Sequence, residues 1–83
     1  MPSDRELVER AYRAWLGYRP KPRPPLPTLS ASTVEHYDGR TYVVLRANGQ
    51  VVDIYRFTNE GQLRLLRRNW PGPYGRRTAV AAA

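Results

Sequence analysis

The chain has 83 residues, with 14 basic and 7 acidic side chains, so its formal net charge is +7. A chain of this length forms one small domain. Such a domain buries only about 60% of the surface that its unfolded chain exposes. The chain has no cysteine, which excludes disulfides and thiolate metal sites, and its single histidine excludes the usual histidine clusters. We therefore expect no metal and no cofactor. No apolar run approaches the roughly 18 residues of a membrane span, so we expect a cytoplasmic protein without a membrane partner.

The first segment has the pattern of an amphipathic helix. Ser3 and Glu6 have the spacing of a capping box, in which the serine hydroxyl accepts the Glu6 backbone N–H. Apolar residues follow at helical spacing, namely Leu7, Val8, Ala11, Tyr12, Trp15 and Leu16. Gly17 can end the helix and Pro20 prevents its continuation. The pattern predicts a helix over residues 4–16.

A proline-rich segment follows at residues 18–29. Its five prolines, with basic residues between them, predict an extended polyproline linker. Residues 21–27 also match the basic-x-x-Pro-x-x-Pro pattern that SH3 domains bind. We favour a spacer between helix and sheet over docking into an aromatic groove, because short proline-rich matches are common.

Three turn signals divide the next segment: Asp38-Gly39, Asn48-Gly49 and Asn59-Glu60-Gly61. They predict strands over 33–37, 40–47, 50–57 and 62–67, joined as an antiparallel up-down β-meander in order 1-2-3-4. With the helix, this gives an α+β fold in a single domain over residues 1–74. Residues 69–74 are expected to be irregular, and 75–83 a disordered tail.

Two-residue turns also predict which side chains share a face of the sheet. One face collects aliphatic residues: Val34, Val43, Leu45, Val52 and Ile54. The other face, which we call the aromatic face, is expected to hold the aromatic interaction residues Tyr37, Tyr42, Tyr55 and Phe57, together with Arg40, Arg46, Val44 and Val51. One helix covers one face of such a sheet, and we expect it on the aliphatic face. The aromatic face then needs a second copy, a ligand, or the C-terminal segment with Trp70 and Tyr74 folding back.

The positive charge lies mainly outside the helix and hairpins. Residues 19–29 carry a net +3 and residues 62–83 a net +5, whereas 1–18 are neutral and 30–61 carry −1. The first strand begins and the fourth ends at the same end of the sheet, so these basic segments should meet there. The candidate nucleic-acid contacts are Arg19, Lys21, Arg23, Arg40, Arg46, Tyr42, Tyr55, Arg67, Arg68, Trp70, Tyr74, Arg76 and Arg77.

Two functions fit this pattern. The first is a small basic protein that binds RNA or single-stranded DNA with little sequence specificity, through arginine–phosphate contacts and base stacking on the aromatic face. The alternative is a non-catalytic interaction module, a homodimer, adaptor or phage-type inhibitor, whose aromatic face docks on a partner and whose basic arms meet an acidic protein surface. No phosphate loop, nucleophile elbow or metal-ligand spacing is present, so we expect no enzyme activity.

Overall fold

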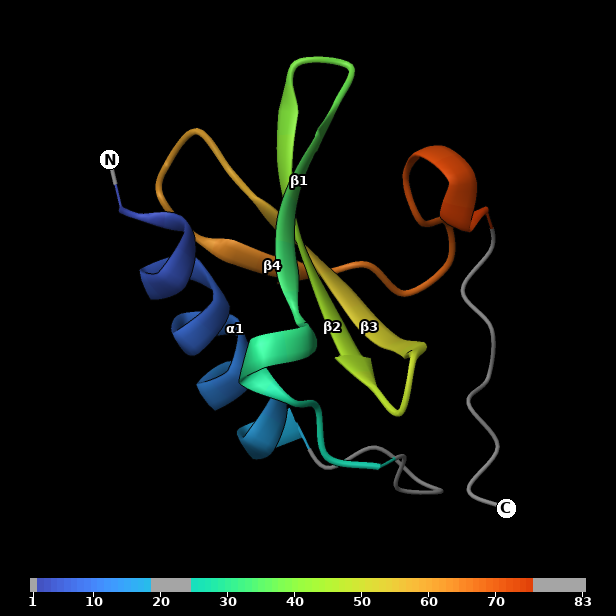
Figure 1. The fold of residues 1–83 in the computed structure, drawn as a ribbon. Coiled ribbons are helices and arrows are strands. Elements are labelled where there is room, and N and C mark those ends of the chain that lie inside the picture. Colours follow the sequence, from blue (N-terminus) through green and yellow to red (C-terminus); the bar gives the residue numbers. More distant parts are fainter. Residues whose placement is uncertain (1, 19–24, 76–83) are drawn as a thin grey trace.

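The computed structural model describes residues 2–18 and 25–75. Its elements are helix α1 (Asp4–Tyr18), 3-10 turn η1 (Leu29–Ala31), strands β1 (Thr33–Tyr37), β2 (Arg40–Ala47), β3 (Gln50–Phe57) and β4 (Leu63–Leu65), and 3-10 turn η2 (Gly72–Tyr74). The strands form one antiparallel sheet in order β1-β2-β3-β4 (Figure 1). The α+β fold of one helix and a four-stranded meander is confirmed. Half of the expected proline-rich linker, residues 19–24, and all of the expected C-terminal tail except Gly75 lie outside the described residues.

Helix α1 begins at the predicted cap and ends two residues later than predicted. The Glu6 backbone N–H donates to Ser3 Oγ at 3.2 Å, and the Ser3 hydroxyl in turn lies 3.4 Å from Glu6 Oε1. Gly17 remains helical, and the helix continues to Tyr18. Glycine disfavours a helix by only about 1 kcal/mol, which neighbouring contacts can offset. The helix therefore extends to within two residues of Pro20, which cannot continue it.

The turns have the backbone conformation that their sequences predict. Asp38 and Gly39 have φ of 52° and 73°, and Asn48 and Gly49 have φ of 53° and 77°. Both central residues of each turn are thus left-handed, as in the hairpin turns whose twist matches that of the strands. Gly61, at φ 79°, has the left-handed position expected in the third turn.

The register between β2 and β3 differs from the prediction because of a β-bulge. Arg46 pairs with Val51 as expected, but Leu45 pairs with Asp53 rather than Val52, and Tyr42 pairs with Arg56 rather than Tyr55. The extra residue in β3 turns every later side chain of that strand to the other face. The predicted aromatic face is therefore wrong: Tyr55 and Phe57 lie on the helix side, and Ile54 lies opposite them.

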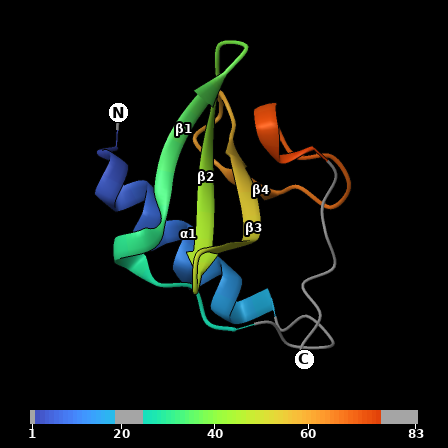
Figure 2. The same cartoon turned by 45° about the vertical axis from the view of Figure 1, so that its right-hand side comes forward.

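The helix side of the sheet holds the larger core. Its buried members are Leu7, Val8, Ala11 and Trp15 of α1 and Val43, Leu45, Ala47, Val52 and Tyr55 of the sheet. Val34, Phe57, Leu63 and Leu65 pack against them, part-buried. The helix thus covers the face that carries most of the predicted aliphatic residues, as expected. Figure 2 shows α1 on one side of the sheet and η2 on the other.

The opposite face, which we call the tail face, is covered by residues 66–74. Trp70 is only 6% exposed and packs with Tyr42, Val44 and Ile54. Tyr37 and Tyr74 join this cluster with their rings edge to face, 6.4 Å between centroids. The fold-back of the C-terminal segment, one of the three covers considered, is therefore the one that the structure shows.

Candidate functional site

Tyr42 and Tyr55, the two central members of the expected stacking surface, are buried on opposite sides of the sheet. Tyr42 is 8% exposed beneath the C-terminal segment, and Tyr55 is 3% exposed beneath α1. Phe57 is part-buried on the helix side, where the Arg10 guanidinium lies 5.9 Å from its ring. Trp70, also an expected nucleic-acid contact, is buried in the tail-face cluster. A base cannot stack on Tyr42 without displacing the C-terminal segment, or on Tyr55 without displacing α1.

Arg46 is engaged within the fold. Its guanidinium donates to Glu35 Oε2 at 3.0 Å, to Thr33 Oγ1 at 2.8 Å and to the Tyr74 hydroxyl at 2.5 Å. It also lies over the Tyr74 ring, 5.8 Å from the centroid. The expectation that Arg46 contacts phosphate is therefore not supported by its position, because each such contact would have to be broken first.

Glu35 is the centre of this network, which ties β1 and β2 to η2. The Tyr37 hydroxyl donates to Glu35 Oε1 at 2.5 Å, and the Tyr74 hydroxyl lies 2.9 Å from both carboxylate oxygens. Burial alone would raise the pKa of Glu35, but hydrogen bonds from Tyr37, Thr33, Arg46 and Tyr74 together lower it to about 2. The hydrogen bond to Glu35 in turn raises the pKa of Tyr37 to about 12. The network therefore stabilises an ionised carboxylate and two neutral phenols across the neutral pH range.

Three arginines share the tail face near one end of the sheet. Arg56 pairs directly with Arg64 on β4 and with Tyr42 on β2. Arg40 lies two residues before Tyr42 and therefore on the same face. None of the three arginines forms an ion pair with another residue in 2–18 or 25–75. Arg40 was an expected contact, whereas Arg56 and Arg64 were not.

A polar pocket of about 330 Å³ lies at this end of the sheet, with lining residues from the β1–β2 turn and the β3–β4 loop. We call it the turn-end pocket, and its lining residues are Gly39, Arg40, Thr41, Arg56, Phe57, Thr58 and Asn59. The Nε atom of Arg56 is shielded from solvent and has no hydrogen-bond partner among the described residues. The pocket thus holds two cationic side chains and no carboxylate in its lining.

Two further expected contacts follow β4. Arg67 and Arg68 are both exposed, and the Arg67 guanidinium lies 5.9 Å from the ring of Tyr18 at the C-terminal end of α1. The other expected basic contacts, Arg19, Lys21, Arg23, Arg76 and Arg77, lie outside the described residues. The basic rim expected from the linker and the C-terminal arm is therefore described only for its Arg67–Arg68 part.

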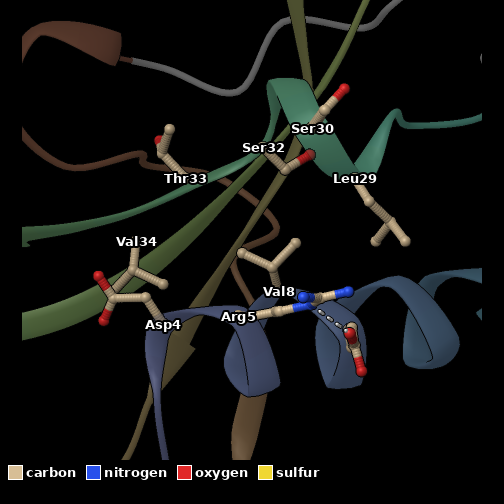
Figure 3. A pocket seen from close by; sticks show the side chains of 9 residues that line it. Asp4, Arg5, Val8, Leu29, Ser30, Ser32, Thr33 and Val34 are labelled. Atoms are coloured by element: carbon tan, nitrogen blue, oxygen red, sulfur yellow. Dashed lines mark hydrogen bonds and ion pairs between the residues drawn. The ribbon is translucent and has the colours of Figure 1, made fainter.

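A second depression lies between α1, η1 and the start of β1. This α1–β1 groove has a volume of about 620 Å³, and Val8, Val34 and Leu29 contribute apolar side chains to it (Figure 3). Asp4, Arg5 and Glu9 of the helix also line it, with Arg5 and Glu9 paired at 3.2 Å. Leu29 is 46% exposed. This is the more apolar of the two depressions. The sequence did not indicate it, because Leu29 was expected to end an extended linker and residues 30–33 to be a polar lead-in to the first strand.

No family model matches the chain, and neither curated proteins nor solved structures gave a match. In the part of the chain that the structure describes, no three His, Cys, Asp or Glu side chains are grouped to hold a metal ion. No helix there has the length and apolar character needed to cross a membrane.

Proposed function

We propose that this protein binds nucleic acid through arginine–phosphate contacts, without catalysis and with little sequence specificity. The observation that carries this proposal is the set of three arginines on the tail face, Arg40, Arg56 and Arg64, which the fold brings together without pairing them to carboxylates. The net charge of +7 supports it, because polyanions are the natural partners of such a chain.

Burial of the aromatic residues changes the mode of binding that we propose. With Tyr42 and Trp70 packed together, base stacking on the sheet plays no part, and the affinity comes from counterions released when arginines neutralise phosphates. Such contacts carry no direct sequence information. We therefore expect similar affinities for RNA and DNA, and we place the protein in the cytoplasm as part of this proposal.

Fluorescence anisotropy with a labelled 20-nucleotide strand at low salt tests this function. We expect binding at micromolar protein that weakens steeply as the salt concentration rises. The slope of log K against log salt is negative, and its magnitude should decrease by about 0.7 for each phosphate contact removed. Arg64→Gln should weaken binding and reduce that slope. Arg13→Gln is the matched control, because it removes the same charge from an exposed position on α1. No binding at low salt, or equal effects of both substitutions, would contradict the proposal.

The second candidate is a protein-interaction module, which the α1–β1 groove favours. No described strand pairs with the outer edge of β1, so that edge has backbone groups free to bind an added strand. An extended peptide of another protein could pair there and place an apolar side chain against Val8 and Val34. Leu29→Asp would then abolish capture of a peptide partner and leave oligonucleotide binding unchanged, as a pull-down and the anisotropy assay would show.

A further inference from the structure

The turn-end pocket has an excess of positive charge that the fold offsets only in part. Arg56 and Arg64 are direct cross-strand neighbours, and like charges in that position destabilise a sheet. Arg40 lies diagonally across from Arg56 on the same face, because Tyr42, two residues after Arg40, pairs with Arg56. Three cations thus converge on one end of one face. An anion bound between them would relieve the repulsion.

Two carboxylates lie in the loops that supply lining residues of the pocket. Glu60, in the β3–β4 loop, has a lowered pKa because its own backbone N–H and the Thr58 hydroxyl stabilise its charge, with Arg64 and Arg56 adding to the effect. Asp38 lies in the exposed β1–β2 turn. Neither residue lines the pocket or forms an ion pair with a described arginine. The two carboxylates reduce the positive potential but leave the arginines able to bind another anion.

The pocket also has the size and donors that a phosphate group needs. A water molecule occupies about 30 Å³ of liquid, so a phosphate that displaces a few waters fits within a pocket of about 330 Å³. Arginine binds phosphate through two parallel N–H donors, and the Asn59 amide at the rim can add a neutral one.

We propose that the turn-end pocket holds a single phosphate group, with Arg40 and Arg56 as its cationic contacts. The identity of the phosphate as part of a nucleic acid rests on the proposed function, whereas the site itself rests on the pocket. It would anchor one phosphate of the strand at a fixed place on the sheet, while Arg64, the cross-strand neighbour of Arg56, meets a neighbouring phosphate less specifically.

An NMR titration of the full chain with inorganic phosphate at constant ionic strength tests the site. We expect saturable shifts of backbone amides at residues 39–41 and 56–59, absent when chloride replaces phosphate. Arg40→Gln, at an exposed position, should weaken phosphate binding by about fivefold or more, as expected for one unit-charge contact at the surface. Glu60→Gln should tighten it, because the substitution removes a competing negative charge. Arg13→Gln should leave it unchanged.

Shifts spread evenly over the surface, or equal binding by Arg40→Gln and the parent, would overturn the site. The anisotropy assay separates this outcome from failure of the proposed function. Oligonucleotide binding that Arg40→Gln does not alter, with no phosphate shifts in the pocket, would refute the site and leave nucleic-acid binding standing. If inorganic phosphate shifts the backbone amides of the pocket but no oligonucleotide binds, the phosphate site is supported and nucleic acid is refuted as the source of the bound phosphate.

Discussion

The indole N–H of Trp15 donates a hydrogen bond to Oδ2 of Asp53 at 3.1 Å, and both side chains are fully buried between α1 and the sheet. A buried carboxylate is costly unless its oxygens accept hydrogen bonds. The β-bulge places Asp53 opposite Leu45, on the helix side, and therefore within reach of the helix. This contact joins the two layers of the fold by a directional bond.

We expect the two residues to be energetically coupled. Trp15→Phe and Asp53→Ala should each destabilise the fold by several kcal/mol, because they combine a lost buried contact with a cavity. In a double-mutant cycle followed by urea unfolding, the coupling should be about 0.5–3 kcal/mol, and the cycle cancels the cavity terms. Additive free energies of unfolding would mean that the hydrogen bond contributes nothing to stability.

The Glu35 network predicts a loss of stability in acid. The pKa of Glu35 falls from 4.5 in the unfolded chain to about 2 in the fold. Its contribution is therefore fully present above about pH 4.5 and is lost as the pH falls towards 2. Urea unfolding between these pH values should show the parent approaching the stability of Glu35→Gln at the acid end. A constant difference between the two proteins over this range would contradict the depressed pKa.

Gly72 allows the C-terminal segment to lie against the sheet. Its φ is 56°, and a Cβ atom there would come within 2.5 Å of the Tyr37 ring, which is itself hydrogen-bonded to Glu35. Gly72→Ala should destabilise the fold by about 1–3 kcal/mol and expose Trp70, shifting tryptophan fluorescence to the red. Gly75→Ala is the matched control, because it also has positive φ but open space around it. Equal effects of the two substitutions would show that the contact with Tyr37 is unimportant.

Gly17 offers the opposite test. It lies within α1, and no atom comes within 4 Å of a Cβ built there. Gly17→Ala should stabilise the protein by up to about 1 kcal/mol, measured as an increase in melting temperature. A decrease would show that the last turn of α1 is not helical in solution.

The helix, the strand order and the turns could be predicted because each has a local cause. Ser3 caps the helix, and Asp38-Gly39 and Asn48-Gly49 supply the backbone conformations that two-residue turns require. Such signals lie within a few residues of the structure they determine.

The faces of β3 could not be predicted from local signals. The bulge adds a residue at Val52, and no glycine or proline within β3 marks it. It lets Tyr55 reach the helix-side core and Asp53 reach Trp15, which are contacts between distant segments. The same shift moves Arg56 to the tail face, where it meets Arg64 and lines the turn-end pocket. The candidate site was therefore missed for the same reason that the aromatic face was wrongly predicted.

The most direct test of phosphate-only binding compares a single-stranded oligonucleotide with an abasic strand of the same length and phosphate number. If the aromatic residues are covered as described and arginines supply the affinity, the two strands should bind equally in anisotropy titrations at low salt. Because stacking contributes about 1–3 kcal/mol per base, a strand with bases that binds about fivefold or more tightly than the abasic strand would contradict this account.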